Sequence, residues 1–396
     1  MNIVYLWYVV LFILLFAKAK VYGHKKWNDE VMSFEQTKSF LGFASICIVL
    51  HHCSQRTCVS WINPFYRRPG LEGFIWVGFI FVAMFFFCSG YALYKGTYRA
   101  GFFKRFLPVR ITTLLVPFLV TLASYVIMFR ANGISLPDNS PIQFGGPTTW
   151  HPYSWYIFAM ILMYIAFYVG FGLFKNDTAG IITVIVGTLA YWLWCFHFNY
   201  GTWWSNSVHL FVCGLLFAKY ETKLLAHLKK FYALKLLLLV ALTGISFIFS
   251  NLMWTLRAKV PAFQSWTPEF INTTQHFCQI FCSMAFVFTC LMLGMKIRIG
   301  NRVLRFLGTF TLELYLVHGF FVHLFSFEFV VGGIKPLYYI ENVALYVLIV
   351  LAVSLPLAYL LSLINKRIVG FIRPRKVLGT KEKIESCSKS ITNQSL

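Results

Sequence analysis

The chain has 396 residues, of which 59% are hydrophobic and only 12% are charged. This composition excludes an ordinary soluble domain, in which about half of the residues are apolar and about a quarter are charged. Apolar segments of roughly 17 to 25 residues recur along the whole chain, and each could cross a hydrocarbon core of about 30 Å. Backbone polar groups in lipid must be satisfied within the segment, so the sequence predicts an all-α polytopic integral membrane protein.

About eleven transmembrane helices are predicted, and an odd number places the two termini on opposite sides of the membrane. In chain order, the expected spans are residues 1–17, 37–54, 74–94, 106–129, 153–174, 180–198, 204–218, 234–254, 272–295, 304–326 and 338–363.

The formal net charge of +22 is divided unevenly between the two sides. If the C-terminus is cytoplasmic, seven basic residues face outward: Arg56, Arg67, Arg68, Arg130, Arg257, Lys259 and Lys335. The other 28 of the 35 Lys and Arg residues then lie in the cytoplasm, as the positive-inside rule requires. We therefore expect a cell-membrane protein with an outside N-terminus and a cytoplasmic C-terminus. Topology accounts for the charge, so no nucleic-acid partner is expected.

Three regions are expected along the chain. Residues 1–30 would form an N-terminal membrane helix with a basic linker, and residues 31–364 would form the main membrane domain. Residues 365–396 would be a basic cytoplasmic tail without ordered structure. The first segment could also be a signal peptide, but its lysines follow the apolar run instead of preceding it, which favours an uncleaved helix.

The cysteines do not indicate a metal site, because neither a CxxC pair nor a Cys/His ligand spacing occurs. Most of them fall inside predicted spans and are expected to pack as small apolar residues. Cys53 and Cys58 lie at the outer end of the second span. They could form a disulfide in an oxidising exterior or remain free, and the sequence leaves both possibilities open.

Two adjacent histidines, His51 and His52, end the second span in the stretch TKSFLGFASICIVLHH, which begins near Lys38. A neutral imidazole can accept a proton from a hydroxyl group and return it to a leaving group. Neighbouring helical residues diverge by about 100°, so only one of the two rings is expected to face a reaction centre. The alternative is a pair of interfacial histidines solvated by lipid headgroups.

Two further stretches carry polar groups near the cytoplasmic side. In FFFCSGYALYKG, Ser89 is a weak candidate nucleophile, and Ser89-Gly90 also suits close helix packing. In FFKRFLPVRITTLLVPF, Arg105 and Arg110 enter the membrane from the cytoplasm and would suit an anionic ligand that bears phosphates. Membrane anchoring explains Arg105 well and the deeper Arg110 less well. We expect Pro108 and Pro117 to disrupt this helix.

An ionisable residue also lies within the tenth span, in GTFTLELYLVHGFF. Glu313 must be protonated or paired at that depth. Glu313 and His318 are five residues apart, about 140° around a helix, so they do not share a face. We therefore expect Glu313 to meet a group from another helix.

In this order, these stretches resemble membrane acyltransferase family 3, the family of bacterial sugar O-acetyltransferases. FLGFASICIVLHH is similar to the opening helix of the family, FFFCSGYALYKG to its second helix and VRITTLLVPF to its third. Three more stretches resemble later helices: SWYIFAMILMYIAFY, WWSNSVHLFVCGLLFAKYE and LGTFTLELYLVHGFF. The resemblance runs from about Phe34 to Ile364 and implies a ten-helix core, with residues 1–17 as an extra helix.

The resemblance implies roles for the candidate residues. His52 would be the catalytic histidine with His51 beside it, Arg110 would face the phosphates of the acyl donor, and Ser89 and Glu313 would line the site. A basic residue of the family should fall at Leu41, where this chain has none. Either Lys38, one turn earlier, substitutes for it or the contact is lost. Thr113 stands where the family often has a second arginine.

The predicted activity is therefore O-acyl transfer, most simply of an acetyl group. Acetyl-CoA would be the cytoplasmic donor, no metal would take part, and the acceptor would be a hydroxyl of a cell-surface or lipid-linked carbohydrate. The diphosphate of the donor would be held by Arg110 and Arg105, and Glu313, if ionised, would orient or stabilise the protonated ring of His52. The expected partners are a glycan or glycolipid acceptor and membrane lipid, and the sequence does not indicate an oligomeric state. A proton-relay transporter that uses His52, Glu313 and His318 is the alternative, and a catalytically inactive membrane partner is a third possibility.

Overall fold

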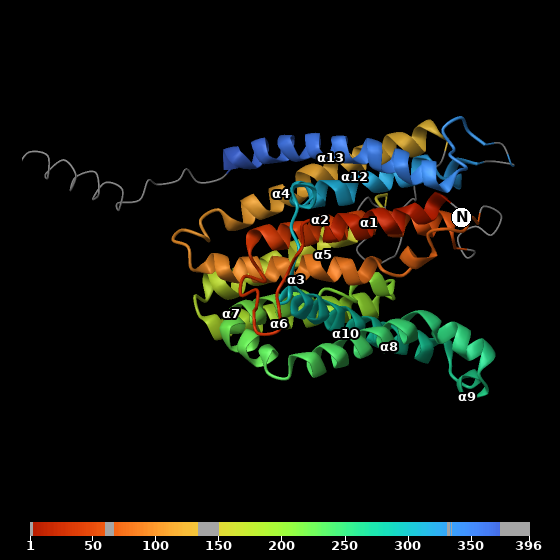
Figure 1. Cartoon of the computed structure of the whole chain (residues 1–396). Coiled ribbons are helices and arrows are strands. Elements are labelled where there is room, and N and C mark those ends of the chain that lie inside the picture. The colour runs from red at the N-terminus through yellow and green to blue at the C-terminus, as the bar shows by residue number, and fades with distance from the viewer. Residues whose placement is uncertain (1–2, 60–66, 134–149, 331–332, 334, 373–396) are drawn as a thin grey trace, which may run out of the picture.

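The computed structural model describes residues 3–59, 67–133, 150–330, 333 and 335–372, which form a bundle of helices (Figure 1). The helices and strands are η1 (Ile3–Tyr5), α1 (Leu6–Phe16), β1 (Lys20–Val21), α2 (Phe34–Thr57), η3 (Glu72–Phe74), α3 (Gly78–Thr97), α4 (Phe106–Ala131), α5 (Trp155–Phe167), η4 (Tyr168–Leu173), α6 (Asp177–His197), η5 (Thr202–Trp204), α7 (Leu210–Lys229), α8 (Tyr232–Lys259), α9 (Pro261–Gln264), α10 (Pro268–Gly294), β2 (Ile297–Arg298), α11 (Arg302–Leu307), α12 (Thr311–Leu324), η6 (Phe327–Phe329) and α13 (Val343–Ile372).

Helical residues occupy most of each predicted span, so the expected all-α membrane architecture is confirmed. Within the described part of the chain, seven helical segments are long and apolar enough to cross a membrane, and α1 and α12 are shorter apolar helices. Polar residues run through α2 and α7, which keeps both helices outside that group of seven. Most of α2 is nevertheless buried, because it packs between α3, α11, α12 and α13.

The two ends of the bundle differ in charge. The N-terminus and the C-terminal end of α13 lie at opposite ends (Figure 1). At the α13 end, Arg105 precedes α4 and donates a hydrogen bond to the Ile372 carbonyl, 3.1 Å away. Strands β1 and β2 pair there in antiparallel register, with Lys20 opposite Arg298. We call this the basic end.

Glycines allow two pairs of helices to approach closely. A Cβ atom at Gly90 of α3 would lie 2.0 Å from the Phe211 carbonyl oxygen of α7, and one at Gly214 would lie 2.0 Å from the Phe87 carbonyl oxygen. Similarly, a Cβ atom at Gly308 would lie 2.0 Å from the Lys38 carbonyl oxygen of α2. Backbones touch at both crossings, the arrangement expected for small residues in membrane helices.

Three sequence expectations need correction or comment at the level of elements. The span 304–326 is not one helix, because residues 308–310 separate α11 from α12. Neither Pro108 nor Pro117 interrupts α4, which is helical from Phe106 to Ala131. The last helix, α13, continues to Ile372, so the expected tail begins later than residue 365, and residues 373–396 lie outside the described residues. Most of the segment 131–152 between α4 and α5 also lies outside them.

Cys53 and Cys58 are both free and buried. Cys58 donates a hydrogen bond through its thiol to the Arg68 carbonyl oxygen, 3.3 Å away. The two cysteines therefore do not form the disulfide that the sequence left open.

Candidate functional site

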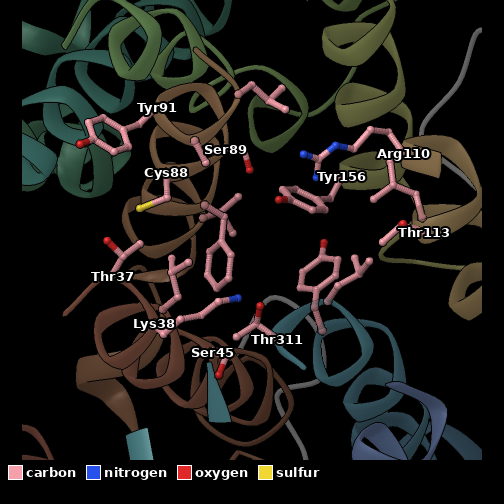
Figure 2. Close-up of a pocket in the computed structure, with 18 of the residues that line it drawn as sticks. Thr37, Lys38, Ser45, Cys88, Ser89, Tyr91, Arg110, Thr113, Tyr156 and Thr311 are labelled. Atoms are coloured by element: carbon pink, nitrogen blue, oxygen red, sulfur yellow. The ribbon is translucent and has the colours of Figure 1, made fainter. Parts of the chain in front are cut away.

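A cavity of about 450 Å³ lies toward the basic end, between α2, α3, α4, α5 and α12 (Figure 2). Its wall includes Phe34 at the start of α2 and Arg99 just beyond α3, which places it near that end. Four basic residues line it, and we call it the cationic cavity: Lys38, Lys95, Arg99 and Arg110.

Lys38 and Arg110 point into the cationic cavity from opposite sides (Figure 2). Neither forms a salt bridge with a described residue. The Arg110 guanidinium lies 5.7 Å from the Phe106 ring and 5.8 Å from the Tyr164 ring, and the Lys38 ammonium lies 5.8 Å from the Phe34 ring. A partly buried cation without a carboxylate partner is costly unless an anion compensates it. The two side chains therefore favour an anionic ligand in the cavity.

Lys95 differs from these two cations. It forms a salt bridge with Glu221 of α7 at 2.7 Å, and Glu221 also accepts a hydrogen bond from Tyr91 at 2.8 Å. This pair neutralises one of the four positive charges. It also ties the wall of the cavity, on α3, to α7.

Leu41 and Thr113 both line the cationic cavity, at the two positions where the family resemblance leads one to expect basic residues. Lys38 lies one helical turn before Leu41 and reaches the same space. The Lys38 ammonium therefore enters the cavity that a basic side chain at position 41 would line. This geometry allows Lys38 to take the place of the missing basic residue.

A second cavity, of about 290 Å³, lies between α2, α3, α5 and α12, on the side away from the basic end. Its wall includes Gln55 and Arg56 near the end of α2 and Gly78 at the start of α3. Three histidines line it, and we call it the histidine cavity: His51, His52 and His323.

The two adjacent histidines have different surroundings. His51 donates a hydrogen bond from Nδ1 to the Phe74 carbonyl oxygen at 2.8 Å, and its ring lies so close to Gly78 that a Cβ atom there would clash at 2.4 Å. This fixed contact suits a positioning role. His52 instead lies among rings, 4.4 Å from Tyr153 and 5.1 Å from His318 between centroids.

Gln55 fixes the tautomer of His52. The Gln55 amide oxygen lies 3.2 Å from His52 Nδ1, so Nδ1 carries the proton that this oxygen accepts. Nε2 then carries the lone pair and can act as a base. Gln55 follows His52 by three residues on the same helix, so the contact is local, but the sequence analysis did not identify it.

His318 is fully buried beside His52. Its Nδ1–H donates to the Leu314 carbonyl oxygen at 2.8 Å, and its Nε2 has no hydrogen-bond partner among the described residues. A second unprotonated imidazole nitrogen is therefore buried close to the candidate base.

A salt-bridge network closes one side of the histidine cavity. Arg56 donates to Glu328 at 2.6 Å and to His323 Nε2 at 3.2 Å, which leaves His323 Nδ1–H to face Glu328. Burial raises the pKa of Glu328, but the hydrogen bond with His323 and the charge of Arg56 outweigh it and hold the pKa at about 2. From the sequence, Arg56 is expected only to face outward, because its partners are about 270 residues away.

Glu313 and Arg105 lie apart from the histidines. Glu313 accepts a hydrogen bond from the Asn365 side chain of α13 at 2.8 Å, and Asn365 also donates to the Thr113 carbonyl oxygen. Another helix thus supplies the partner of Glu313, but this partner is not His52. Arg105 is exposed at the basic end and does not line the cationic cavity.

Ser89 and Gly90 have different roles, one in lining the site and the other in helix packing. Ser89 lines the cationic cavity and points into it (Figure 2), whereas Gly90 forms the close crossing with α7. The packing interpretation and the site interpretation therefore apply to adjacent residues on different faces of α3.

The two cavities adjoin. Ile48 of α2, Val82 of α3 and Tyr315 of α12 line both of them. A basic cavity and an imidazole base are thus separated by one shared wall in the interior of the bundle. Within the described residues, no group of three or more His, Cys, Asp or Glu side chains could hold a metal ion.

Comparison with known protein families gives one match, to a family model described as an acyltransferase domain, over residues 42–363. This region contains both cavities except for five residues that line the cationic cavity: Met32, Phe34, Thr37, Lys38 and Leu41. The chain matches no curated protein and no solved structure.

Proposed function

Since this chain belongs to acyltransferase family 3 and is an acyltransferase of the membrane, we propose that it moves an acetyl group from acetyl-CoA to a carbohydrate hydroxyl. The observation that carries the proposal is the wall shared by the cationic cavity and the histidine cavity. A donor with phosphates could enter from one side of this wall and a hydroxyl acceptor from the other.

The cationic cavity supports a CoA thioester as the donor. A diphosphate needs cations that are not already neutralised, and Lys38 and Arg110 are such cations. Arg110 presents a planar fork of N–H groups that suits phosphate oxygens, and Lys38 adds a compact charge on the opposite side. Arg99 replaces Arg105 in the proposed donor site, because Arg99 lines the cavity.

His52 is the proposed general base. Its Nε2 takes the proton of the acceptor hydroxyl as that oxygen attacks the thioester carbonyl carbon. The tetrahedral intermediate collapses, the C–S bond breaks and the CoA thiolate receives the proton from the imidazolium. The products are an O-acetyl ester and CoA, so atoms and charge balance without a metal or an oxidant.

Gln55 takes the orienting role that the sequence analysis gave to Glu313. Its amide oxygen holds the Nδ1–H of His52 and becomes a better partner for that proton when the ring is positively charged. Glu313 is then a structural residue that joins α12 to α13 through Asn365.

Aromatic side chains support a carbohydrate acceptor in the histidine cavity. Tyr153, Trp155 and Trp203 line it, and flat rings present the apolar surface on which the C–H face of a sugar stacks. Gln55 and Asn206 add amide groups that can hydrogen-bond to hydroxyls. The proposed orientation puts the basic end in the cytoplasm of a cell-membrane protein, with the histidine cavity nearer the outer face.

The proposal is tested by acetyl transfer in isolated membranes. Membranes that contain the full chain are incubated with acetyl-CoA labelled in the acetyl group, and label in the glycan and glycolipid fractions is counted. His52→Ala should reduce transfer by at least about a hundredfold, the lower end of the range for loss of a general base. His197→Ala, which changes an exposed histidine at the end of α6, should transfer at the wild-type rate.

Equal labelling by the wild type and His52→Ala would disprove the mechanism. Absence of label in glycan with the wild type would disprove the acetyl donor or the carbohydrate acceptor. Membership of an acyltransferase family favours the enzyme over the transporter alternative, and slow hydrolysis of acetyl-CoA by purified protein would separate the two directly.

A further inference from the structure

Tyr315 is the polar residue on the wall shared by the two cavities. Among the described residues that line both cavities, Ile48 and Val82 have hydrocarbon side chains. Tyr315 alone of these three carries a hydrogen-bond donor. An acyl group that passes from the donor to a hydroxyl at this wall therefore meets one polar side chain.

The Tyr315 hydroxyl has no hydrogen-bond acceptor among the residues that the structure describes. Its oxygen is buried and makes no hydrogen bond of standard geometry with a described residue. Its polar neighbours are the Tyr153 and Tyr156 hydroxyls and the Trp155 indole, whose N–H only donates. The phenolic hydrogen is thus left without a partner, a condition that costs about 1–3 kcal/mol for a buried group.

The ring of Tyr315 is held from several sides. Its centroid lies 5.4 Å from the Tyr156 ring, 6.0 Å from the Tyr153 ring and 6.0 Å from the His318 ring. Tyr156 belongs to the cationic cavity and Tyr153 to the histidine cavity, so contacts from both sides fix the phenol between them. A donor that is fixed before the reaction does not need to reorganise during it.

We propose that the Tyr315 hydroxyl donates a hydrogen bond to the oxyanion that forms on the acyl carbonyl oxygen during transfer. This inference rests on the proposed function and assigns the oxyanion-stabilising residue of the same site. Negative charge develops on the carbonyl oxygen when the acceptor oxygen attacks, and it disappears when the C–S bond breaks. Tyr315 keeps its proton throughout, so no bond to the phenol forms or breaks.

The proposal explains an unsatisfied group that a purely structural role does not explain. A tyrosine that serves packing alone would be replaced by phenylalanine without loss, because the unpaired hydroxyl weakens the fold. A fixed donor that lacks a ground-state acceptor gains its partner in the transition state, where it lowers the barrier. Stability is then lost in exchange for activity, as is common at active sites.

The test compares two Tyr→Phe variants of the full chain. Tyr315→Phe should lower the maximal rate of acetyl transfer in membranes about a hundredfold, the effect of removing one oxyanion donor, with the KM for acetyl-CoA unchanged. Its melting temperature in detergent should equal or exceed that of the wild type. The matched control is Tyr191→Phe, outside both cavities, where the lost hydroxyl donates to the Trp204 carbonyl oxygen at 2.9 Å.

Tyr191→Phe should show the reverse pattern, with a lower melting temperature and the wild-type maximal rate. Three results would overturn the inference: a wild-type rate for Tyr315→Phe, a raised KM with an unchanged maximal rate, or a fall in rate that follows a fall in melting temperature. If the wild type transfers acetyl and His52→Ala does not, such a result refutes the role of Tyr315 alone. If the wild type transfers no acetyl, the proposed function fails first.

Discussion

Individual charges are placed where a phosphate-bearing donor would need them. Lys38 and Arg110 approach the cationic cavity from different helices, and neither has a carboxylate partner among the described residues. Arg105, which precedes the same helix as Arg110, lies outside the cavity and contacts the end of α13. Five residues of separation along one segment thus distinguish a candidate binding residue from a structural one.

The first prediction concerns donor affinity. Arg110→Gln should raise the KM for acetyl-CoA by about ten- to a hundredfold, because one charge-assisted hydrogen bond contributes roughly 1.5–3 kcal/mol. Initial rates of label transfer in membranes, measured over a series of acetyl-CoA concentrations, give the KM. Arg302→Gln, which changes an exposed arginine at the start of α11, is the control and should leave the KM unchanged. Equal KM values for both variants would remove Arg110 from the donor site.

A second prediction follows from the low pKa of Glu328, which is held at about 2 although burial raises it, because the hydrogen bond with His323 and the charge of Arg56 lower it more. An unfolded glutamate has a pKa of about 4.3, so the stabilisation by the charged form is complete above that pH and is lost as the pH falls toward 2. Glu328→Gln should therefore melt below the wild type at pH 7, and the gap should narrow between about pH 4.5 and pH 2.

Thermal unfolding in detergent over this pH range measures the gap for Glu328→Gln. Glu269→Gln, which changes an exposed glutamate in the first turn of α10, should melt like the wild type at pH 7. A gap that stays constant down to pH 2 would show that the charge of Glu328 is not the source of its contribution.

At the scale of elements, the crossing of α3 and α7 positions one wall of the cationic cavity. Gly90 faces α7 while Ser89 faces the cavity, so the close packing of α3 against α7 positions the wall to which Ser89 belongs. The break between α11 and α12 has a related effect, because it brings Thr311, at the start of α12, to the cavity beside Lys38 (Figure 2). Irregular backbone inside a membrane domain is tolerated where protein surrounds it.

The third prediction tests this crossing. Gly90→Ala should lower the stability of the protein by about 1–3 kcal/mol, because its Cβ would lie 2.0 Å from the Phe211 carbonyl oxygen and the helices must separate. Melting temperature in detergent is the measurement. Gly244→Ala in α8 is the control, since a Cβ there meets no atom within 4 Å, and alanine is the better helix former. An equal melting temperature for Gly90→Ala and the wild type would show that the crossing is not tight.

For the whole molecule, the distribution of charge and the positions of the two cavities are consistent with the same orientation in the membrane. The cationic cavity lies toward the basic end and the histidine cavity away from it. If the basic end faces the cytoplasm, the proposed CoA donor would meet the cations of the cationic cavity on the side where CoA thioesters are made. The acceptor then approaches from the outer side.

The fourth prediction concerns this orientation. In intact cells, a membrane-impermeant maleimide should label Gln264→Cys, because α9 lies at the end of the bundle that carries the N-terminus (Figure 1). It should not label His24→Cys until the cells are permeabilised, because the carbonyl of residue 24 is held by Lys296 at the basic end. The opposite labelling pattern would show that the topology is inverted and that the cationic cavity does not face the cytoplasm.

The sequence by itself determined the membrane helices, their approximate ends and the family of the chain. Runs of apolar residues, the Ser89-Gly90 pair and the His51-His52 doublet are local, and burial of the backbone in lipid acts on each span separately. The helix break at residues 308–310 and the continuity through Pro117 were not predicted, because packing against neighbouring helices decided both.

Only the tertiary structure decided which polar groups meet. Glu313 pairs with Asn365, 52 residues away, and His52 lies beside His318, on another helix. Tyr315 gained its importance in the same way, because a wall shared by two cavities exists only after α2, α3 and α12 have packed together. Contacts between helices depend on how whole faces fit against one another, and no short stretch of sequence contains that information.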